Sequence, residues 1–428
     1  MNRRNFIRYT GLLAPAIVAF NPLSARQTAF LQKFASDKGN ANRVLVLIQL
    51  NGGNDGLNTI IPLKSYNVLS EVRKNILIPE SQVLKLNSSN SYGIHPSMPG
   101  LQQLYNNKMV SVIHGVGYPN PDLSHFKGIN IKLTANCNPD SSRSGWVGRY
   151  LEQAYPDYGK NKNITVTDGP PGMRIGEVSP IISQGTNVDL GIGVNSIDDL
   201  NFSGPDISKD PLSNNMGGTT IGLIRDISKQ VEMYAPIIKS ASEKQPNLSK
   251  LYPEEHKNQL ADQLKIVARL IGGNLNSRVY VVNQMGYDTH ANQVDKADPT
   301  KGAHADLLHN LSEAITAFED DLHLMGKQDE VLGMTFSEFG RRIKSSDSYG
   351  TDHGTAETVI LFGTKLKAGM IEAQPETPLQ LTDENLPVFF DFRSVYASVL
   401  KGWFGLPEEK LKNIIQQGPA ERLDLFTV

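Results

Sequence analysis

Residues 43–59, RVLVLIQLNGGNDGLNT, decide the fold class of this chain. The run VLVLIQL is almost continuously apolar and rich in β-branched side chains, which is the pattern of a strand buried on both faces of a parallel sheet. It ends in NGGNDGLNT, where three glycines permit a tight turn and leave Asp55 near the carboxyl end of the strand. In open α/β sheets, ligands bind at this end of the strands.

Strand and helix patterns alternate along the rest of the chain. Strands are expected at residues 109–117, 278–284, 330–340 and 357–363, and helices near 219–240, 254–272, 303–326 and 391–405. This alternation predicts an α/β fold with a doubly wound, mostly parallel sheet, in a single domain over residues 42–428. Residues 168–215 are rich in Gly, Pro, Ser and Asn and are predicted to form a loop-rich insertion.

The first 25 residues carry the pattern of an export signal. Arg3 and Arg4 precede an apolar run from Leu12 to Phe20, and NPLSA provides a small-residue exit near Ala25. This order predicts a twin-arginine signal peptide over residues 1–25 and a periplasmic or secreted protein. The apolar run is too short to span a bilayer as a helix, so we expect no transmembrane anchor after removal of the signal.

The composition excludes several classes of function. The chain has 42 Lys and Arg against 44 Asp and Glu, without the strongly basic field of a nucleic-acid binder. Cys137 is the only cysteine, so no internal disulfide can form. The sequence also lacks a G-x-S-x-G elbow, a phosphate-binding GxxxxGK[ST] loop, an HExxH motif and a CxxC pair.

Polar residues that suit metal chemistry follow the expected strands. Because strand carboxyl ends converge on one edge of such a sheet, these side chains are expected to meet there. Asp, Glu and His are ligands for a divalent metal such as zinc or manganese, and serine can serve as a metal-activated nucleophile. The candidates are Asp55, Ser124, His125, Asp288, His290, Glu338, Asp352 and His353.

Each candidate also has a purely structural interpretation. Asp55 can cap the helix that follows it, and Ser124 can be a turn or N-cap residue. His125 can be a partly buried core histidine. Glu338 can form a structural ion pair with Arg341 or Arg342. The residues alone leave these alternatives open.

Several motifs together resemble one family. They are LVLIQLNGGNDGLNTIIP, HPSMPGLQQLY, VGYPNPDLSHF, SGWVGRYLE, GYDTHANQ, TFSEFGRR, GTDHGTAETVILFG and DFRSVYASVL, in that order over residues 43–405. The chain resembles the domain of unknown function 1501 family, which comprises exported bacterial proteins that often carry a twin-arginine signal. That family's fold is thought similar to the alkaline phosphatase and sulfatase superfamily, whose enzymes hydrolyse phosphate or sulfate esters at a metal centre.

The resemblance implies roles for most of the candidates. Asp55 would stand near the superfamily's first-strand metal carboxylate, and Ser124 would occupy the nucleophile region with His125 beside it. Asp288 and His290 resemble a downstream ligand pair.

Two alignments are open for the later ligands. Asp352 and His353 can copy the superfamily's Asp-His pair, or Glu338 can take the Asp position and leave His353 as a lone ligand. We prefer the second, because Glu338 closes a strand, and Asp352 would then orient His353 without binding the metal. Phe339 stands where a neighbouring His ligand would follow Glu338, and the C/S-x-P-x-R pattern of sulfatases is missing. These departures imply one metal instead of two, or an inactive relative.

Two functions are therefore expected as alternatives. In the first, the protein hydrolyses a small anionic phosphate or sulfate ester, with Ser124 as nucleophile and Arg341 paired with the anionic group. In the second, it is a non-catalytic protein that keeps the fold to bind or assemble with a component of the cell envelope.

Overall fold

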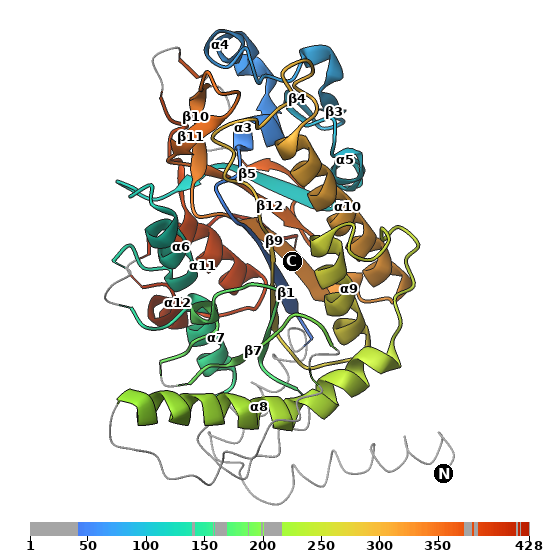
Figure 1. The fold of residues 1–428 in the computed structure, drawn as a ribbon, viewed down its shortest axis with the longest axis vertical. Coiled ribbons are helices and arrows are strands. Elements are labelled where there is room, and N and C mark those ends of the chain that lie inside the picture. The colour runs from blue at the N-terminus through green and yellow to red at the C-terminus, as the bar shows by residue number, and fades with distance from the viewer. Residues whose placement is uncertain are drawn as a thin grey trace, which may run out of the picture. The chain divides into compact units, whose positions relative to one another are not determined.

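Within the residues that the computed structural model describes, nine strands form one central sheet (Figure 1). Its main path runs β13 (Gly369–Ile371), β5 (Val110–Gly117), β12 (Glu357–Phe362), β9 (Val331–Phe336), β1 (Val44–Leu50), β8 (Val279–Gln284), β6 (Gly172–Ile175) and β7 (Gly191–Val194), while β14 (Phe390–Asp391) pairs with β5. Within this sheet β12 is antiparallel to β5 and β9, and the other described pairs are parallel. The mostly parallel α/β sheet predicted from the sequence is confirmed.

The structure describes residues 42–138, 142–156, 158, 169–186, 188–197, 200, 216–371, 379–380, 384–416, 418–419 and 421–427. Arg43–Val428 form one compact unit. The predicted signal peptide over residues 1–25 lies outside the described residues.

Helices cover both faces of the sheet, as a doubly wound fold requires. Residues of β1 alternate between two apolar cores: Val46 and Ile48 pack in one, and Leu45 and Leu47 pack in the other. The first core lies under α5 (Pro99–Asn106), α8 (Met216–Lys244), α9 (Gln259–Gly272) and α10 (Ala303–Leu324). The second lies under α6 (His125–Thr134), α7 (Trp146–Ala154), α11 (Phe392–Gly402) and α12 (Glu408–Ile414). In Figure 1 the sheet lies between these helices and the pair α9 and α10.

Capping side chains define where two of these helices begin. The Asn258 side chain accepts a hydrogen bond from the backbone N–H of Ala261 at the start of α9, and Asp391 accepts one from Arg393 at the start of α11. No helix among the described residues is both long and apolar enough to cross a membrane.

Residues 168–215 are not only a loop-rich insertion. In the described part of this segment, β6 pairs in parallel with β8, and β7 pairs in parallel with β6, so both strands extend the central sheet. Their sequences, GMRI and GIGV, are only four residues long, and each contains glycine. Such short runs have no readable period, so the sequence did not reveal that they are strands.

Two small sheets lie outside the central one. β2 (Ile60–Pro62), β4 (Ser89–Ile94) and β3 (Leu84–Leu86) form the first, after the short helix α3 (Gly56–Thr59), with α4 (Tyr66–Val72) between β2 and β3 in the chain. β10 (Gly340–Ser345) and β11 (Thr351–Gly354) form the second, an antiparallel pair in which Arg341 stands opposite His353. The segment around His353 is therefore a short strand defined by its pairing with β10.

One carboxyl group is buried without a partner in the helical layer. Glu319 of α10 is 3% exposed, and neither side-chain oxygen has a hydrogen-bond partner among the described residues. Burial disfavours the charged form and raises the pKa of Glu319 from 4.5 to about 8. The folded protein therefore keeps this carboxyl protonated at a pH where the unfolded chain ionises it.

We predict that Glu319→Gln stabilises the protein above neutral pH. Because the pKa is raised in the folded state, the stability associated with protonated Glu319 is complete below about pH 4.5 and is lost as pH rises towards 8. The variant should therefore unfold at higher urea concentration than the wild type at pH 8, and with a weaker pH dependence. Glu71→Gln, at an exposed carboxyl on α4, is the control. An unchanged slope of stability against pH in Glu319→Gln would contradict this assignment.

Candidate metal centre

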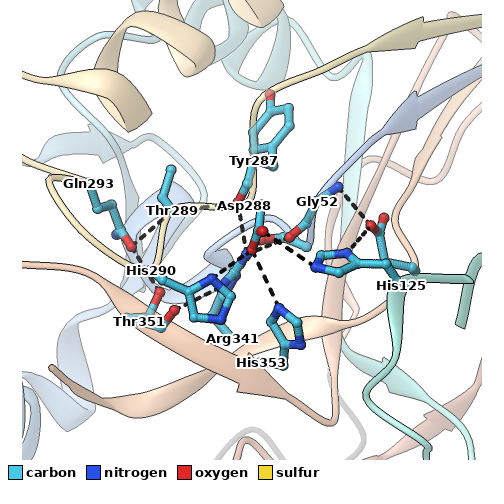
Figure 2. A network of polar contacts seen from close by, with 12 residues as sticks. Gly52, His125, Tyr287, Asp288, Thr289, His290, Gln293, Arg341, Thr351 and His353 are labelled. Carbon is cyan, nitrogen blue, oxygen red and sulfur yellow. Dashed lines mark hydrogen bonds and ion pairs between the residues drawn. The ribbon is translucent and has the colours of Figure 1, made fainter. Parts of the chain in front are cut away.

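Four segments that are distant in the sequence bring the candidate residues to one edge of the sheet. His125 is the first residue of α6, after β5, and Asp288 and His290 follow β8. Glu338 follows β9, and His353 lies in β11. Figure 2 shows Asp288 at the centre of this cluster, with the three imidazole rings around it.

Three of these side chains form a group that suits a metal ion. His125, Asp288 and His353 each offer one ligand atom, and these atoms lie within 4.8 Å of one another. His125 Nε2 is 3.4 Å from Asp288 Oδ2, and His353 Nε2 is 3.4 Å from Asp288 Oδ1. Ligand atoms about 2.0 Å from a tetrahedral metal are separated from each other by about 3.3 Å. The group therefore fits a small divalent ion.

Hydrogen bonds at the other ring nitrogen orient both imidazoles. His125 Nδ1 lies 2.9 Å from Glu338 Oε1, and His353 Nδ1 donates to the backbone carbonyl of Leu123 at 2.8 Å. Both Nε2 atoms are thereby directed at Asp288. Carboxylate and carbonyl partners of this kind hold metal-binding histidines in the correct tautomer. Two imidazoles and a carboxylate are a donor set for zinc or manganese.

Glu338 is thus a partner of His125 rather than a member of the three-residue group. It is 4% exposed, and it also accepts hydrogen bonds from the Gly52 N–H and the Ser337 hydroxyl. Behind it, Glu357 accepts from the Ser337 N–H and pairs with buried Lys132. Glu338 was expected as a metal ligand; in this structure its carboxylate is hydrogen-bonded to His125, Gly52 and Ser337.

His290 stands beside the group without belonging to it. Its Nδ1 lies 2.8 Å from Asp288 Oδ1, and its side chain is 44% exposed. The hydroxyls of Ser346 and Ser348 donate to the His290 carbonyl. The serines of the β10–β11 connection therefore fix the backbone that carries His290, and His290 in turn orients Asp288.

Arg341 lies beneath Asp288 and links the turns around it. Its side chain is fully buried and donates to Asp288 Oδ1 at 2.7 Å. Arg341 was expected to pair with an anionic substrate; in this structure its guanidinium is buried and bonded to Asp288. Its other hydrogen bonds go to the backbone carbonyls of Gly52, Gly53, Tyr287 and Thr351.

The charges in the cluster favour metal binding by Asp288. Partial burial alone raises the pKa of Asp288, but the hydrogen bond and charge of Arg341, with smaller contributions from His290 and His353, lower it to about 2. Burial lowers the pKa of His353, and the charge of Arg341 lowers it further against the opposing effect of the Leu123 carbonyl. An ionised carboxylate and a neutral imidazole are the forms that bind metals.

Two glycines permit the close backbone approaches at the site. A Cβ on Gly52, whose φ is +120°, would lie 2.3 Å from the backbone nitrogen of Asp288. A Cβ on Gly350 would lie 2.3 Å from the carbonyl carbon of His290. Larger residues at either position would push away the turn that carries the metal-binding groups.

Asp55 is not part of the cluster. It is 1% exposed and pairs with Arg73, which is also fully buried, at 3.2 Å. It also accepts a hydrogen bond from Gln293 Nε2 at 2.7 Å. Burial alone raises the pKa of Asp55, but these contacts outweigh burial, so the pKa lies below its ordinary value. Asp55, predicted as a metal ligand, is held in buried contacts in this structure, and Arg73 is the partner that sequence reasoning missed.

Asp352 also differs from its expected role. β11 places Thr351 and Asp352 on opposite faces, and Asp352 is exposed whereas Thr351 is buried. Successive side chains of a strand point to opposite faces, so Asp352 points away from the face that His353 shares with Thr351. The Leu123 carbonyl, a backbone group with no sequence signature, orients His353 instead.

Ser124 is exposed at the N-cap position of α6, directly before His125. Its side chain makes no capping hydrogen bond, and its hydroxyl has no hydrogen bond to the cluster among the described residues. The sequence placed His125 beside the nucleophile, and in the structure its Nε2 is one of the three atoms of the candidate metal group. The position of His125 after a strand was a signal for this role.

Comparisons with known proteins bear on part of the chain. The family model described as a protein of unknown function (DUF1501) matches residues 228–414, which include Asp288, His290, Glu338 and His353. The resemblance seen in the motifs is confirmed over those residues. No curated protein matches the chain.

The chain is also similar to several solved structures. One is the C-terminal periplasmic domain of EcEptC from Escherichia coli in complex with zinc, at 8% identity and a TM-score of 0.36, over 77% of this chain and 75% of that chain. A second is the alkaline phosphatase of the Antarctic bacterium TAB5, at 10% identity and a TM-score of 0.31, over 89% and 100%. A third is the phosphonate monoester hydrolase of Agrobacterium radiobacter, at 10% and 0.34, over 89% and 79%.

We predict that Asp55→Asn destabilises the fold, by roughly 3 kcal/mol, because it leaves the Arg73 guanidinium buried without a counter-charge. Urea denaturation measures this change. Asp352→Asn removes an exposed carboxylate and should alter stability by less than about 0.5 kcal/mol. Equal effects of the two substitutions would show that Asp55 is not the structural carboxylate described above.

Proposed function

We propose that the protein is an exported hydrolase that binds one divalent metal ion, zinc or manganese, through His125, Asp288 and His353, and cleaves a phosphate or sulfate ester. The observation that carries this proposal is the convergence of two oriented Nε2 atoms on one ionised carboxylate. Export by the twin-arginine route rests on the sequence of residues 1–25.

The bound ion would polarise the ester and stabilise the negative charge that develops in the transition state. Asp288, kept ionised by Arg341, and the imidazoles of His125 and His353 would hold it. The cluster is open to substrate, since the Asp288 side chain is 49% exposed and that of His125 is 35% exposed. Ser124, exposed directly before His125, is the proposed nucleophile.

A second function has its own support. Arg341 and Asp55, which the sequence analysis expected to contact the anion and the metal, are both held in buried contacts. A protein with this placement could bind a component of the cell envelope through one metal without catalysis. Turnover distinguishes the two functions.

We predict that the folded protein binds one equivalent of zinc or manganese and that His353→Ala loses it, because the substitution removes one of three ligands. Metal analysis after gel filtration measures the content. His256→Ala, at an exposed histidine outside the cluster, should retain the metal. Metal that is bound equally by wild type and His353→Ala would reject the assigned centre.

The same preparations test catalysis. Metal-dependent hydrolysis of aryl phosphates or sulfates by the wild type, lost in His353→Ala, is the expected result. If no ester is turned over, the envelope-binding function is favoured. Full activity in Ser124→Ala would assign the nucleophile to water instead of Ser124.

We also predict that Glu338→Gln weakens metal affinity by about 10- to 100-fold while the protein stays folded, because the amide orients His125 but lacks the negative charge that makes its imidazole a stronger ligand. Competition with a chelator measures the affinity. Glu384→Gln, at an exposed carboxyl, serves as the control. An unchanged affinity in Glu338→Gln would limit Glu338 to a packing role.

A further inference from the structure

A cavity of about 760 Å³ lies at the carboxyl ends of β6, β7 and β8. Its walls come from residues at or directly after the ends of these strands and from α8 and α9. The described residues that line it do not include His125, Asp288 or His353, so the cavity is separate from the metal-binding group. Its volume is typical of a site for a small organic ligand, and ligands of α/β sheets bind at this edge.

Asn283 lines the cavity with a buried amide that has no partner. The residue is 4% exposed and lies near the end of β8. Its backbone N–H and carbonyl are bonded to the Gln263 side chain at 2.9 and 2.8 Å, but the side-chain Oδ1 and Nδ2 have no hydrogen-bond partner among the described residues. Polar side chains buried to this extent are normally hydrogen-bonded, so this amide points to a ligand.

Gly176 leaves that amide uncovered. The glycine follows β6 and also lines the cavity. A Cβ at this position would lie 2.7 Å from Asn283 Oδ1 and 2.8 Å from Gln263 Oε1. A larger residue would therefore cover the amide that the cavity presents.

Arg269 supplies unused donors on the same lining. Its Nε donates to the Ser242 carbonyl at 3.0 Å, while within the described part of the chain its two Nη groups have no hydrogen bond and no carboxylate forms an ion pair with it. Gln259 and Arg269 both line the cavity, and the ten residues of α9 between them span about 15 Å. The cavity therefore has room for an elongated ligand.

The lining mixes hydrogen-bond donors and acceptors without a dominant charge. Among the described residues that form it are four carboxylate, three cationic and five amide side chains. An anion would meet the carboxylates, and a cation would meet the lysines and the arginine. Hydroxyl groups both donate and accept, so an uncharged ligand rich in hydroxyls can bond to all three kinds of side chain.

We propose that this cavity is a binding site for a neutral carbohydrate of at least two sugar rings. Hydroxyls of one ring would bond to the Asn283 amide, and hydroxyls of another would bond to Gln259 and Arg269. Met285, which is 52% exposed and lines the cavity, would pack against the C–H face of a ring. The site goes beyond the proposed hydrolysis and does not depend on the metal centre.

The test titrates the folded protein at pH 7 with maltose, lactose, cellobiose and N,N′-diacetylchitobiose and follows binding by saturation-transfer NMR. Glucose, glucuronate and glucosamine are the comparators for length and charge. We expect at least one disaccharide to bind with a Kd of about 1 mM or tighter, and more tightly than every comparator. No binding of any disaccharide up to about 20 mM would overturn the proposal. Tighter binding of glucuronate or glucosamine would do the same.

Two substitutions in the lining locate the bound sugar. Asn283→Ala and Gln259→Ala should each weaken binding by about tenfold through the loss of hydrogen bonds to the ligand. Both variants should stay folded, because the Asn283 side chain has no hydrogen bond to lose and Gln259 is exposed. Asn107→Ala, at an exposed asparagine outside the cavity, is the matched control. Unchanged affinity in both lining variants would overturn the assignment.

Removal of the metal separates this site from the proposed hydrolase. Disaccharide binding should persist in the presence of EDTA and in His353→Ala. Binding that is lost under both conditions would place the sugar at the metal centre and overturn the second site. Binding by a protein that holds no metal would support the carbohydrate site and reject the proposed metal centre.

Discussion

The geometry of the site depends on one buried guanidinium. Arg341 joins the turn after β1, the turn after β8 and strand β11, and it also holds the central carboxylate, Asp288. A buried charge is costly unless it is paired and its donors are satisfied. Arginine meets both conditions here, because its planar fork reaches several acceptors at once, which the ammonium of lysine cannot do. The three segments are therefore fixed relative to each other, and so are the groups they carry.

The parallel sheet supplies the first condition for this arrangement. β1, β8 and β9 are neighbours and run in the same direction, so the residues after them emerge at one edge. The antiparallel pair of β10 and β11 then returns His353 to that edge, opposite Arg341. Each imidazole of the three-residue group has a fixed partner at Nδ1, which leaves Nε2 directed at Asp288.

Burial assigns different roles to three carboxylates that look alike in the sequence. Asp288 is half-exposed, ionised and open to a ligand. Glu338 is almost fully buried and serves His125 from behind. Asp55 is closed off by Arg73 and stabilises the fold. A single accessible carboxylate with two imidazoles suits one metal ion.

The sequence by itself determined the fold class and the edge of the sheet at which the chemistry lies. Continuous apolar runs and helical periods are local signals, and strand ends of a parallel sheet converge whatever the side chains are. It therefore identified Asp288, His290 and His353 as neighbours. The tertiary structure alone decided which of the candidates face a ligand. Their exposure depends on partners that lie far away along the chain or are backbone groups without a side-chain signature. These partners are Arg73 for Asp55, the Leu123 carbonyl for His353 and the backbone carbonyls around Arg341. Burial and hydrogen bonding are set by such long-range contacts, which no local pattern in one sequence records.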